Sequence, residues 1–258
     1  MPLKLEVVGR TDVGRKRGHN EDALSLDHEN RLYIVADGMG GHASGEVASG
    51  MAVETLTQFF KETRDDQDKT WPYKMDKTLS YEENRLSNGV KLANKQIFRR
   101  AQADLRLKGM GTTVVSLFCT DRYAYIGHVG DSRVYRVRDK KLKQITEDHS
   151  LLNDYMKIKK LTQSEIDNFP HKNVIVRALG MKELVQVDIC REELQKGDIY
   201  LLCSDGLSGL VEDQEMCKIV VEHEADLPEA AKILIETANK NGGNDNITVV
   251  LARVESAS

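Results

Sequence analysis

Apolar residues near the start of the chain alternate with polar ones or form short runs, which is typical of β-strands. Three strands are predicted there, over residues 3–11, 23–26 and 31–36. The pattern then changes to apolar residues at helical spacing, and it predicts helices from Ala43 to about Lys61 and from about Glu82 to Leu107. The charged stretch between these helices is predicted to be a loop in which Trp71 serves as a local packing anchor.

The middle of the chain holds four short apolar segments separated by turn residues, a pattern that predicts an antiparallel meander. These strands cover 112–119, 123–128, 133–138 and 141–145. Residues 148–180 are less regular, with helical pieces at 151–157 and 164–168. The last third predicts strands at 184–189, 198–204 and 247–254 and helices at 213–223 and 227–240. Runs of strands interrupted by pairs of helices favour an α+β fold with largely antiparallel sheets.

Composition narrows the class of protein. The 258 residues carry 37 Lys and Arg against 41 Asp and Glu, a formal net charge of -4, which argues against electrostatic binding of nucleic acid. No proline-rich or glycine-rich linker divides the chain, so we expect one domain over residues 1–258. No apolar run is long enough for a bilayer, and the N-terminus lacks a secretory apolar core. The four cysteines lack zinc-ligand spacing, so we expect reduced thiols in a cytoplasmic protein.

Six acidic residues stand where predicted strands begin or end: Glu21, Asp22, Asp37, Asp131, Asp205 and Asp245. Each alone is explained by a turn, because Asp and Gly are the usual turn residues. If they met, their charges would raise one another's pKa values, whereas clustered oxygen ligands suit Mg²⁺ or Mn²⁺. Two such ions lower the pKa of a bound water and neutralise a phosphoryl group under attack. Spacing along the chain does not show that the six residues converge.

Eight short motifs contain most of these acids and follow one another along nearly the whole chain. They are Arg17–Asp22, Asp37–His42, Gly109–Thr113, Gly130–Arg133, Glu147–Ser150, Arg177–Gly180, Ser204–Leu207 and Gly243–Thr248. In this order they resemble the metal-dependent serine/threonine protein phosphatases of type 2C, in their compact bacterial form. Each motif alone is weak, whereas the ordered set is highly specific.

The resemblance implies a four-layer α-β-β-α sandwich, in which two central antiparallel sheets are flanked by pairs of helices. It implies that Asp37 bridges two Mn²⁺ or Mg²⁺ ions, that a third ion binds more weakly, and that Asp37 and Asp205 are the catalytic carboxylates. The implied protein ligands are Glu21 and the Gly38 carbonyl for one ion, Asp205 and Asp245 for the other, and Asp131 with Asp205 for the third.

By the same resemblance, Arg17 would bind phosphate oxygens with its planar guanidinium fork, and Asp22 would orient a metal-held water. The implied reaction is direct attack of that water on phosphoserine or phosphothreonine, with no phosphoenzyme. The chain departs from the animal enzymes, because it has Met39 where they have a histidine. His42 is then the nearest candidate general acid, and a residue packed against the glycine turn is an equal alternative for it.

Residues 148–179 occupy the position of the family's mobile flap. Four lysines add positive charge to this segment: Lys157, Lys159, Lys160 and Lys172. They favour a role in substrate choice, with a solvated loop as the alternative. Six other histidines show no ligand spacing and are predicted to be structural or exposed: His19, His28, His128, His149, His171 and His223.

The leading hypothesis for function is an active phosphoprotein phosphatase, since none of the family's acids is missing. A catalytically silent module that recognises phosphoproteins and a hydrolase of phosphorylated metabolites are the alternatives. By analogy with the family, the expected partners are phosphorylated proteins, among them a serine/threonine kinase or its substrates. We expect a monomer with no nucleic-acid or membrane partner.

Overall fold

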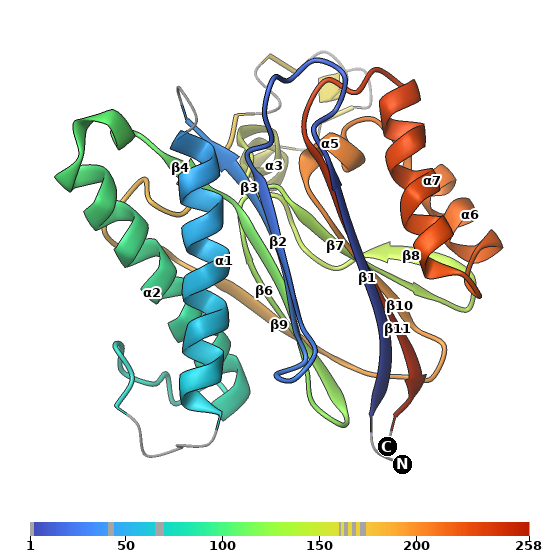
Figure 1. Ribbon diagram of the computed structural model, residues 1–258, viewed down its shortest axis with the longest axis horizontal. Coiled ribbons are helices and arrows are strands. Elements are labelled where there is room, and N and C mark those ends of the chain that lie inside the picture. Colours follow the sequence, from blue (N-terminus) through green and yellow to red (C-terminus); the bar gives the residue numbers. More distant parts are fainter. Residues whose placement is uncertain are drawn as a thin grey trace.

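The computed structural model describes residues 3–40, 44–64, 70–159, 161–162, 165–166, 169–170 and 174–257. Two antiparallel sheets pack face to face, and a pair of helices covers the outer face of each sheet (Figure 1). The predicted four-layer α+β sandwich is therefore confirmed.

The first sheet has five strands, and the chain ends of the described region lie side by side in it. Its order is β1 (Lys4–Asp12), β11 (Ile247–Ser256), β10 (Ile199–Cys203), β7 (Arg133–Arg138) and β8 (Lys141–Gln144). Along its outer face run α6 (Asp213–Glu222) and α7 (Leu227–Lys240). Helix α7 begins where the Asp226 carboxylate accepts a hydrogen bond from the Glu229 amide, a side-chain cap for an otherwise unpaired donor.

The second sheet is built from the remaining strands. Its order is β2 (Asp22–Asp27), β3 (Leu32–Met39), β5 (Val114–Cys119), β6 (Tyr123–Val129) and β9 (Asp188–Glu193), with β4 (Gly111–Thr112) paired to the end of β3. Helices α1 (Ser44–Thr63) and α2 (Tyr81–Ala103) cover it, and a short 3₁₀ turn (Leu105–Leu107) follows. Helix α2 starts at a capping box in which Ser80 and Glu83 bond each other's backbone amides.

Three apolar layers hold the sandwich together, and the middle one lies between the two sheets. There, residues such as Val35 and Leu117 of the second sheet meet Tyr200 and Leu202 of the first. The predicted packing role of Trp71 is supported, because its ring lies 6.1 Å from that of Phe59, beside the core under α1 and α2.

The predicted meander over 112–145 is wrong, because the chain changes sheets in its middle. Strand β6 pairs with β5 and β9, whereas β7 pairs with β8 and β10 in the other sheet. The change occurs at Gly130, whose φ of 116° lies in a region that side chains disfavour. An added Cβ there would lie 2.5 Å from the Cβ of Thr113. This turn between the sheets carries Asp131.

Two other segments differ from the prediction. The strand expected at 184–189 instead covers Asp188–Glu193, and the apolar side chain of Leu184 is 74% exposed. Asp205 begins a short helix, α5 (Asp205–Ser208), that the pattern did not predict. The expected helical piece at 164–168 falls largely outside the described residues.

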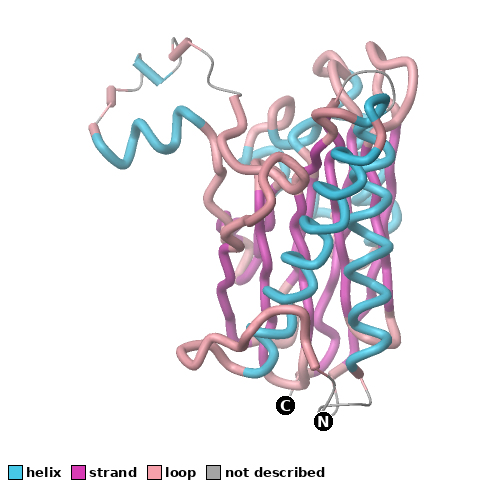
Figure 2. Tube along the Cα trace, turned by 90° about the vertical axis from the view of Figure 1, so that its left-hand side faces the viewer, coloured by secondary structure: helices cyan, strands magenta, loops and turns pink. Residues whose placement is uncertain are grey.

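The segment after β8 leaves the body of the molecule. Its helix α3 (Leu151–Ile158) projects beyond the ends of the strands (Figure 2).

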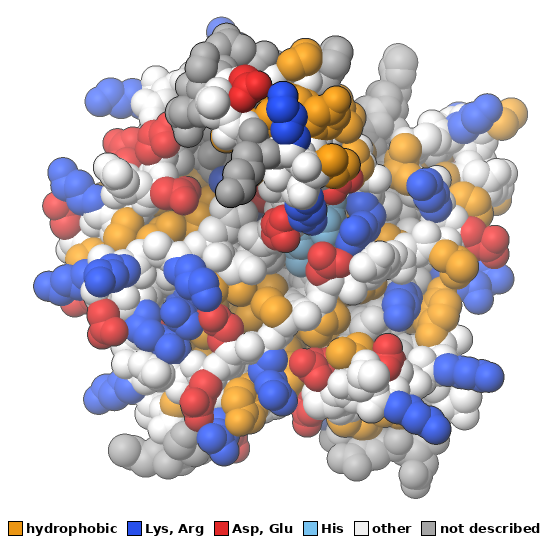
Figure 3. Space-filling view, turned by 180° about the vertical axis from the view of Figure 1, so that it is seen from behind, with side chains coloured by type: hydrophobic (Ala, Val, Ile, Leu, Met, Phe, Trp, Pro, Cys, Tyr) orange, Lys and Arg blue, Asp and Glu red, His pale blue; other side chains and the backbone are white. Residues whose placement is uncertain are grey.

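All four cysteines are free, as predicted. Within the described ranges, no helix is both long and apolar enough to span a bilayer. On the face seen from behind, acidic and basic side chains are interspersed (Figure 3).

Candidate metal centre

Carboxylates from distant parts of the chain meet at the upper end of both sheets in Figure 1. They stand at the end of β3, in the turn between β6 and β7, at the start of α5, before β11 and at the start of β2. Burial raises the pKa of Asp37 far above its usual value, and the neighbouring negative charges raise it further. Those charges belong to Asp22, Asp205, Asp131 and Asp245. The fold therefore gathers five of the six acids into one cluster.

Asp22 joins the two sheets at this cluster. It lies opposite Asp37 in the β2–β3 register. Its Oδ2 accepts hydrogen bonds from the Thr248 hydroxyl at 2.6 Å and the Ser204 hydroxyl at 2.8 Å, both from the other sheet. Burial nevertheless raises the pKa of Asp22 to about 7, because these two bonds offset only part of the lost hydration. Neither hydroxyl was singled out from the sequence.

The backbone of Asp37 is fixed by the two threonines next to β4. Its amide donates to the Thr113 hydroxyl at 3.1 Å, and its carbonyl accepts from the Thr113 amide at 2.8 Å and from the Thr112 hydroxyl at 2.8 Å. These bonds set the direction in which the carboxylate leaves the strand. The predicted Gly109–Thr113 motif contained both residues, although nothing in their spacing showed this use.

Asp205 is an acidic neighbour of Asp37, and its negative charge is one of those that raise the pKa of Asp37. Burial raises the pKa of Asp205 as well, and the charge of Asp245 raises it further. Carboxyl groups that raise one another's pKa values in this way are stabilised in the charged form by a nearby positive charge.

Asp131 and Asp205 line one small cavity of about 200 Å³. Its other lining residues are Arg133, Asp148, Ser150, Leu152, Ser208 and Gly209. Burial raises the pKa of Asp131 to about 7, and the charges of Asp205 and Asp148 add to this effect. The cavity is large enough for an ion with its waters and too small for a drug-sized molecule.

Glu21 packs against the peptide of Gly38, and two glycines allow this close approach. An added Cβ on Gly38 would lie 2.2 Å from the Gly45 carbonyl oxygen and 2.5 Å from that of Glu21. An added Cβ on Gly45 would lie 2.7 Å from Glu21 Oε1. The Glu21 carboxylate and the end of β3 are thus held together by positions that admit no side chain.

The donor set fits a hard divalent cation. Three buried carboxylate oxygens have no hydrogen-bond partner among the described residues: Glu21 Oε1, Asp22 Oδ1 and Asp131 Oδ1. An unpaired buried polar atom is costly, and these belong to groups that readily ligate Mg²⁺ or Mn²⁺. In the part of the chain that the structure describes, however, no three acidic, histidine or cysteine side chains form a ready metal cage. The fit to a cation therefore rests on the chemistry of these oxygens and not on their spacing.

Arg17 supplies the positive charge at the open side of the cluster. Its Nη2 donates to Asp245 Oδ2 at 2.6 Å, and this hydrogen bond raises the pKa of the guanidinium. The two loops that carry this pair are tied together by Asn246. Its side chain accepts from the Glu21 amide at 2.8 Å and donates to the Val13 carbonyl at 2.9 Å.

The sequence model described as "Protein phosphatase 2C" matches residues 13–252 of the chain. The chain belongs to the protein phosphatase 2C family. The expected family and enzyme class, a protein phosphatase, are thereby confirmed.

Bacterial relatives of this phosphatase match it over most of their length. It is 39% identical over 249 residues to "Serine/threonine phosphatase stp" of Listeria monocytogenes, covering 94% of this chain and 93% of that one. It is 37% identical over 253 residues to "Protein phosphatase PhpP" of Streptococcus pneumoniae, covering 96% of each.

Solved structures agree with this family. The Mycobacterium tuberculosis serine/threonine phosphatase PstP/Ppp superposes with a TM-score of 0.83 at 35% identity, over 98% of this chain and all of that one. The catalytic domain of PstP in complex with two manganese ions gives a TM-score of 0.82, with the same identity and coverage.

Two of the four lysines expected to add positive charge to residues 148–179 have acidic neighbours. Lys157 Nζ lies 3.2 Å from Glu147 Oε1, and Lys159 Nζ lies 3.5 Å from Glu165 Oε1, so neighbouring acids balance both lysines. Four other residues named from the sequence lie outside the described residues: Lys160, Lys172, His171 and the candidate general acid His42.

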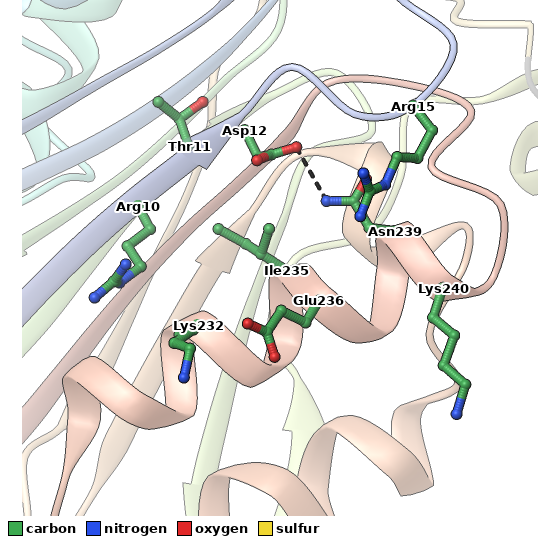
Figure 4. A pocket seen from close by; sticks show the side chains of 9 residues that line it. All are labelled: Arg10, Thr11, Asp12, Arg15, Lys232, Ile235, Glu236, Asn239 and Lys240. Atoms are coloured by element: carbon green, nitrogen blue, oxygen red, sulfur yellow. Dashed lines mark hydrogen bonds between the residues drawn. The ribbon is translucent and has the colours of Figure 1, made fainter.

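A larger cavity of the phosphatase lies away from the carboxylate cluster. It measures about 650 Å³ and opens between β1 and α7 (Figure 4). Its Asp12 carboxylate accepts from the Asn239 side chain at 3.0 Å and from the Gly14 amide at 2.8 Å. These bonds secure the start of the loop that carries Arg17. They leave no cluster of unpaired acids there to hold a metal.

Proposed function

We propose that the phosphatase removes phosphate from phosphoserine and phosphothreonine in proteins, by direct attack of water and without a phosphoenzyme. The observation that carries this proposal is the cluster of aspartates around Asp37, whose charges raise one another's pKa values and beside which buried carboxylate oxygens lack a hydrogen-bond partner among the described residues. When bound, two Mn²⁺ or Mg²⁺ ions supply a water of lowered pKa and neutralise charge on the phosphoryl oxygens.

The residues proposed to hold the ions are those of the cluster. Asp37 would hold both ions of the pair, and a third, weaker ion would be held by Asp131 and Asp205, which line the same cavity. The remaining proposed ligands are Glu21 and the Gly38 carbonyl on one side and Asp245 with Asp205 on the other. Asp22, held by hydroxyls of the opposite sheet, orients water from the edge of the cluster.

Arg17 is proposed to bind the phosphoryl group. In the metal-free arrangement its guanidinium neutralises Asp245. A cation on Asp245 would take over that task, and the planar fork of Arg17 would then be available for two phosphate oxygens. The same competition explains why Arg17 lies at the entrance rather than inside the cluster.

His42 stays the proposed general acid for the leaving alkoxide. The experiment is His42→Ala assayed with a phosphopeptide and an aryl phosphate over a range of pH. Loss of an ionisation from the phosphopeptide profile supports the role, because only the peptide has a poor leaving group. An unchanged phosphopeptide profile contradicts it.

A groove beside the end of the flap is proposed to contact the protein substrate through apolar side chains. It measures about 380 Å³ and runs from Met39 along Ile175 and Val176 of the flap to Met181 and Leu184, which follow the flap and are 54% and 74% exposed. Changing both Met181 and Leu184 to serine should raise KM for a phosphopeptide and leave aryl phosphate hydrolysis unchanged. Equal effects on both substrates would contradict this use of the groove.

The central experiment compares hydrolysis of phosphopeptide, aryl phosphate and phosphorylated metabolites, with and without Mn²⁺. Wild type should release phosphate from the phosphopeptide only with the ion, and Asp37→Asn and Asp205→Asn should be inactive. Release from metabolites alone would favour the small-molecule hydrolase. Binding of phosphopeptide without any release would favour the silent module.

The physiological partners and setting are part of the same proposal. We propose that the substrates are proteins phosphorylated by a serine/threonine kinase, or that kinase itself, and that the enzyme acts as a cytoplasmic monomer. Phosphate release from an autophosphorylated kinase is the direct assay for the first part, and light scattering measures the second.

A further inference from the structure

The backbone of Gly130 is held by two buried histidines that the sequence did not mark as functional. Its amide donates to Nδ1 of His149 at 3.0 Å. Its carbonyl accepts from Nε2 of His128 at 2.8 Å and from the backbone amide of His149 at 2.8 Å. The two peptide groups that meet at Gly130 are therefore both satisfied, and three hydrogen bonds fix their orientation.

The direction of these bonds fixes the form of each ring. A backbone amide only donates, so Nδ1 of His149 carries no proton and the neutral ring has its proton on Nε2. Nε2 lies 3.1 Å from Asp188 Oδ2 and 3.0 Å from Arg177 Nη1. Arg177 Nη1 also donates to Asp188 Oδ1 at 2.6 Å, so the Asp188 carboxylate accepts from both side chains. A carbonyl only accepts, so Nε2 of His128 carries the proton. Burial lowers the pKa of both rings, that of His128 to about 3, which keeps both neutral.

The residue before His149 holds the other end of the same turn. Asp148 accepts a forked pair of bonds from Arg133, from Nε at 2.9 Å and from Nη2 at 2.7 Å. Two adjacent residues at the base of the flap thus bind the two residues that flank Asp131 and Ser132. The turn between the sheets is held at both ends by one dipeptide.

From this turn the contacts continue to Asp37. The hydroxyl of Ser132 lies 2.7 Å from that of Thr113, which in turn accepts the amide of Asp37 at 3.1 Å. Asp131 itself points into the cavity that it shares with Asp205, with Oδ1 unpaired. A small rotation of the Gly130 peptide would therefore change the separation of Asp131 from the other carboxylates.

We propose that His149 is a positioning residue, whose Nδ1 fixes the backbone amide of Gly130 and thereby the direction in which Asp131 enters the cavity. This inference rests on the proposed metal-binding function of Asp131. A ring that only fills space would act through its packing, whereas a positioning ring acts through one acceptor atom. Two substitutions that place a side-chain amide near different ring nitrogens separate these roles.

The matched pair is His149→Asn and His149→Gln. The amide oxygen of asparagine falls near the place of Nδ1 and can still accept from Gly130, whereas glutamine reaches the place of Nε2 and keeps only the contacts with Arg177 and Asp188. Both variants remove the ring, so both lose its packing. Thermal unfolding of each records that shared loss.

The first measurement is amide hydrogen exchange at Gly130 in the metal-free protein. We expect about tenfold or greater acceleration in His149→Gln and little change in His149→Asn, because one buried hydrogen bond is lost only in the former. The second is the Mn²⁺ concentration for half-maximal aryl phosphate hydrolysis, which should rise about tenfold in His149→Gln alone. Equal changes in the two variants would overturn the inference.

The Asp131→Asn background tests whether the effect passes through Asp131. We expect His149→Gln to add nothing to Asp131→Asn in the hydrolysis assay, and independent losses would overturn the inference. If Asp131→Asn itself leaves hydrolysis unchanged, the metal role of Asp131 is wrong, and Gly130 exchange alone decides whether His149 orients the turn.

If His149→Gln does not fold, His128→Gln and His128→Leu form a second pair, since only glutamine keeps the donor to the Gly130 carbonyl. Faster Gly130 exchange in His128→Leu than in His128→Gln is expected, and equal rates would overturn the inference.

Discussion

Replacing Asp131 with asparagine should stabilise the metal-free protein while lowering the turnover of the loaded enzyme. The pKa of Asp131 is raised from 3.8 to about 7, because the carboxyl is buried and faces Asp205 and Asp148. A folded-state pKa above the unfolded one means that the folded chain binds more protons between these values. The stabilisation is complete below pH 4 and is lost as the pH rises through 7.

The size of this effect follows from the shift. A difference of about 3 units corresponds to about 4 kcal/mol, of which about 3 kcal/mol is lost between pH 5 and pH 8. Asparagine imitates the neutral carboxyl and has no proton to lose. In EDTA, the variant should therefore gain about 3 kcal/mol in unfolding free energy relative to wild type between pH 5 and pH 8.

Urea unfolding at the two pH values measures this difference, and Glu224→Gln is the control because Glu224 is an exposed acid in a distant turn. The control should show no change with pH relative to wild type. Adding Mn²⁺ at pH 8 should stabilise wild type more than Asp131→Asn and leave the variant with slower turnover. A difference between variant and wild type that is the same at pH 5 and pH 8 would refute the reasoning.

Three further changes test separate parts of the site. Arg17→Ala should raise KM for aryl phosphate at least about tenfold, since a charge-assisted bond to phosphate is lost, and an unchanged KM would contradict phosphate binding. Thr248→Val removes one of the two hydroxyl donors to Asp22 and should lower the free energy of unfolding at pH 8 by about 1–3 kcal/mol; urea unfolding that shows no loss would argue against this bond. Gly130→Ala should destabilise by about 2 kcal/mol or more, because φ is positive and the new Cβ has no room, whereas Gly50→Ala in α1, where nothing lies within 4 Å, should be neutral or stabilising. Similar calorimetric melting temperatures for the two alanine variants would count against strain at Gly130.

Much of the fold could be predicted because its elements carry strong local patterns. The helix expected from about Glu82 to Leu107 appears as α2 and a 3₁₀ turn, since its apolar residues repeat at helical spacing. Strand β9 was predicted too early in the chain, because it is an edge strand with the mixed sequence of Asp188–Glu193. The more apolar residues just before it, such as Val185 and Val187, pack against the core without forming a strand. The crossing at Gly130 was missed because a turn residue does not reveal which sheet the next strand joins.

The sequence predicted which acidic residues form the candidate site but not the contacts that hold them in place. Acids at strand ends, together with the motif order, pointed to Asp37 and Asp205. Their proximity depends on two strands from different sheets, so no local pattern encodes it. The supporting roles of Thr113, Ser204 and His149 were missed for the same reason. The local sequence around a hydroxyl or imidazole in a turn does not show whether its hydrogen-bond partner is water or a distant backbone group.

The seam between the two sheets has a consequence for substitutions far from any substrate. Asp22 and Asp37 stand on one sheet and Asp205 and Asp245 at the ends of strands in the other, while the contact surface behind them is apolar. Sliding one sheet over the other by a fraction of an ångström would alter the spacing of every acid pair that spans the seam. Side chains such as Leu202, deep in that surface, thus act as spacers for the chemistry. A change of side-chain volume there should lower turnover before it measurably alters the overall structure.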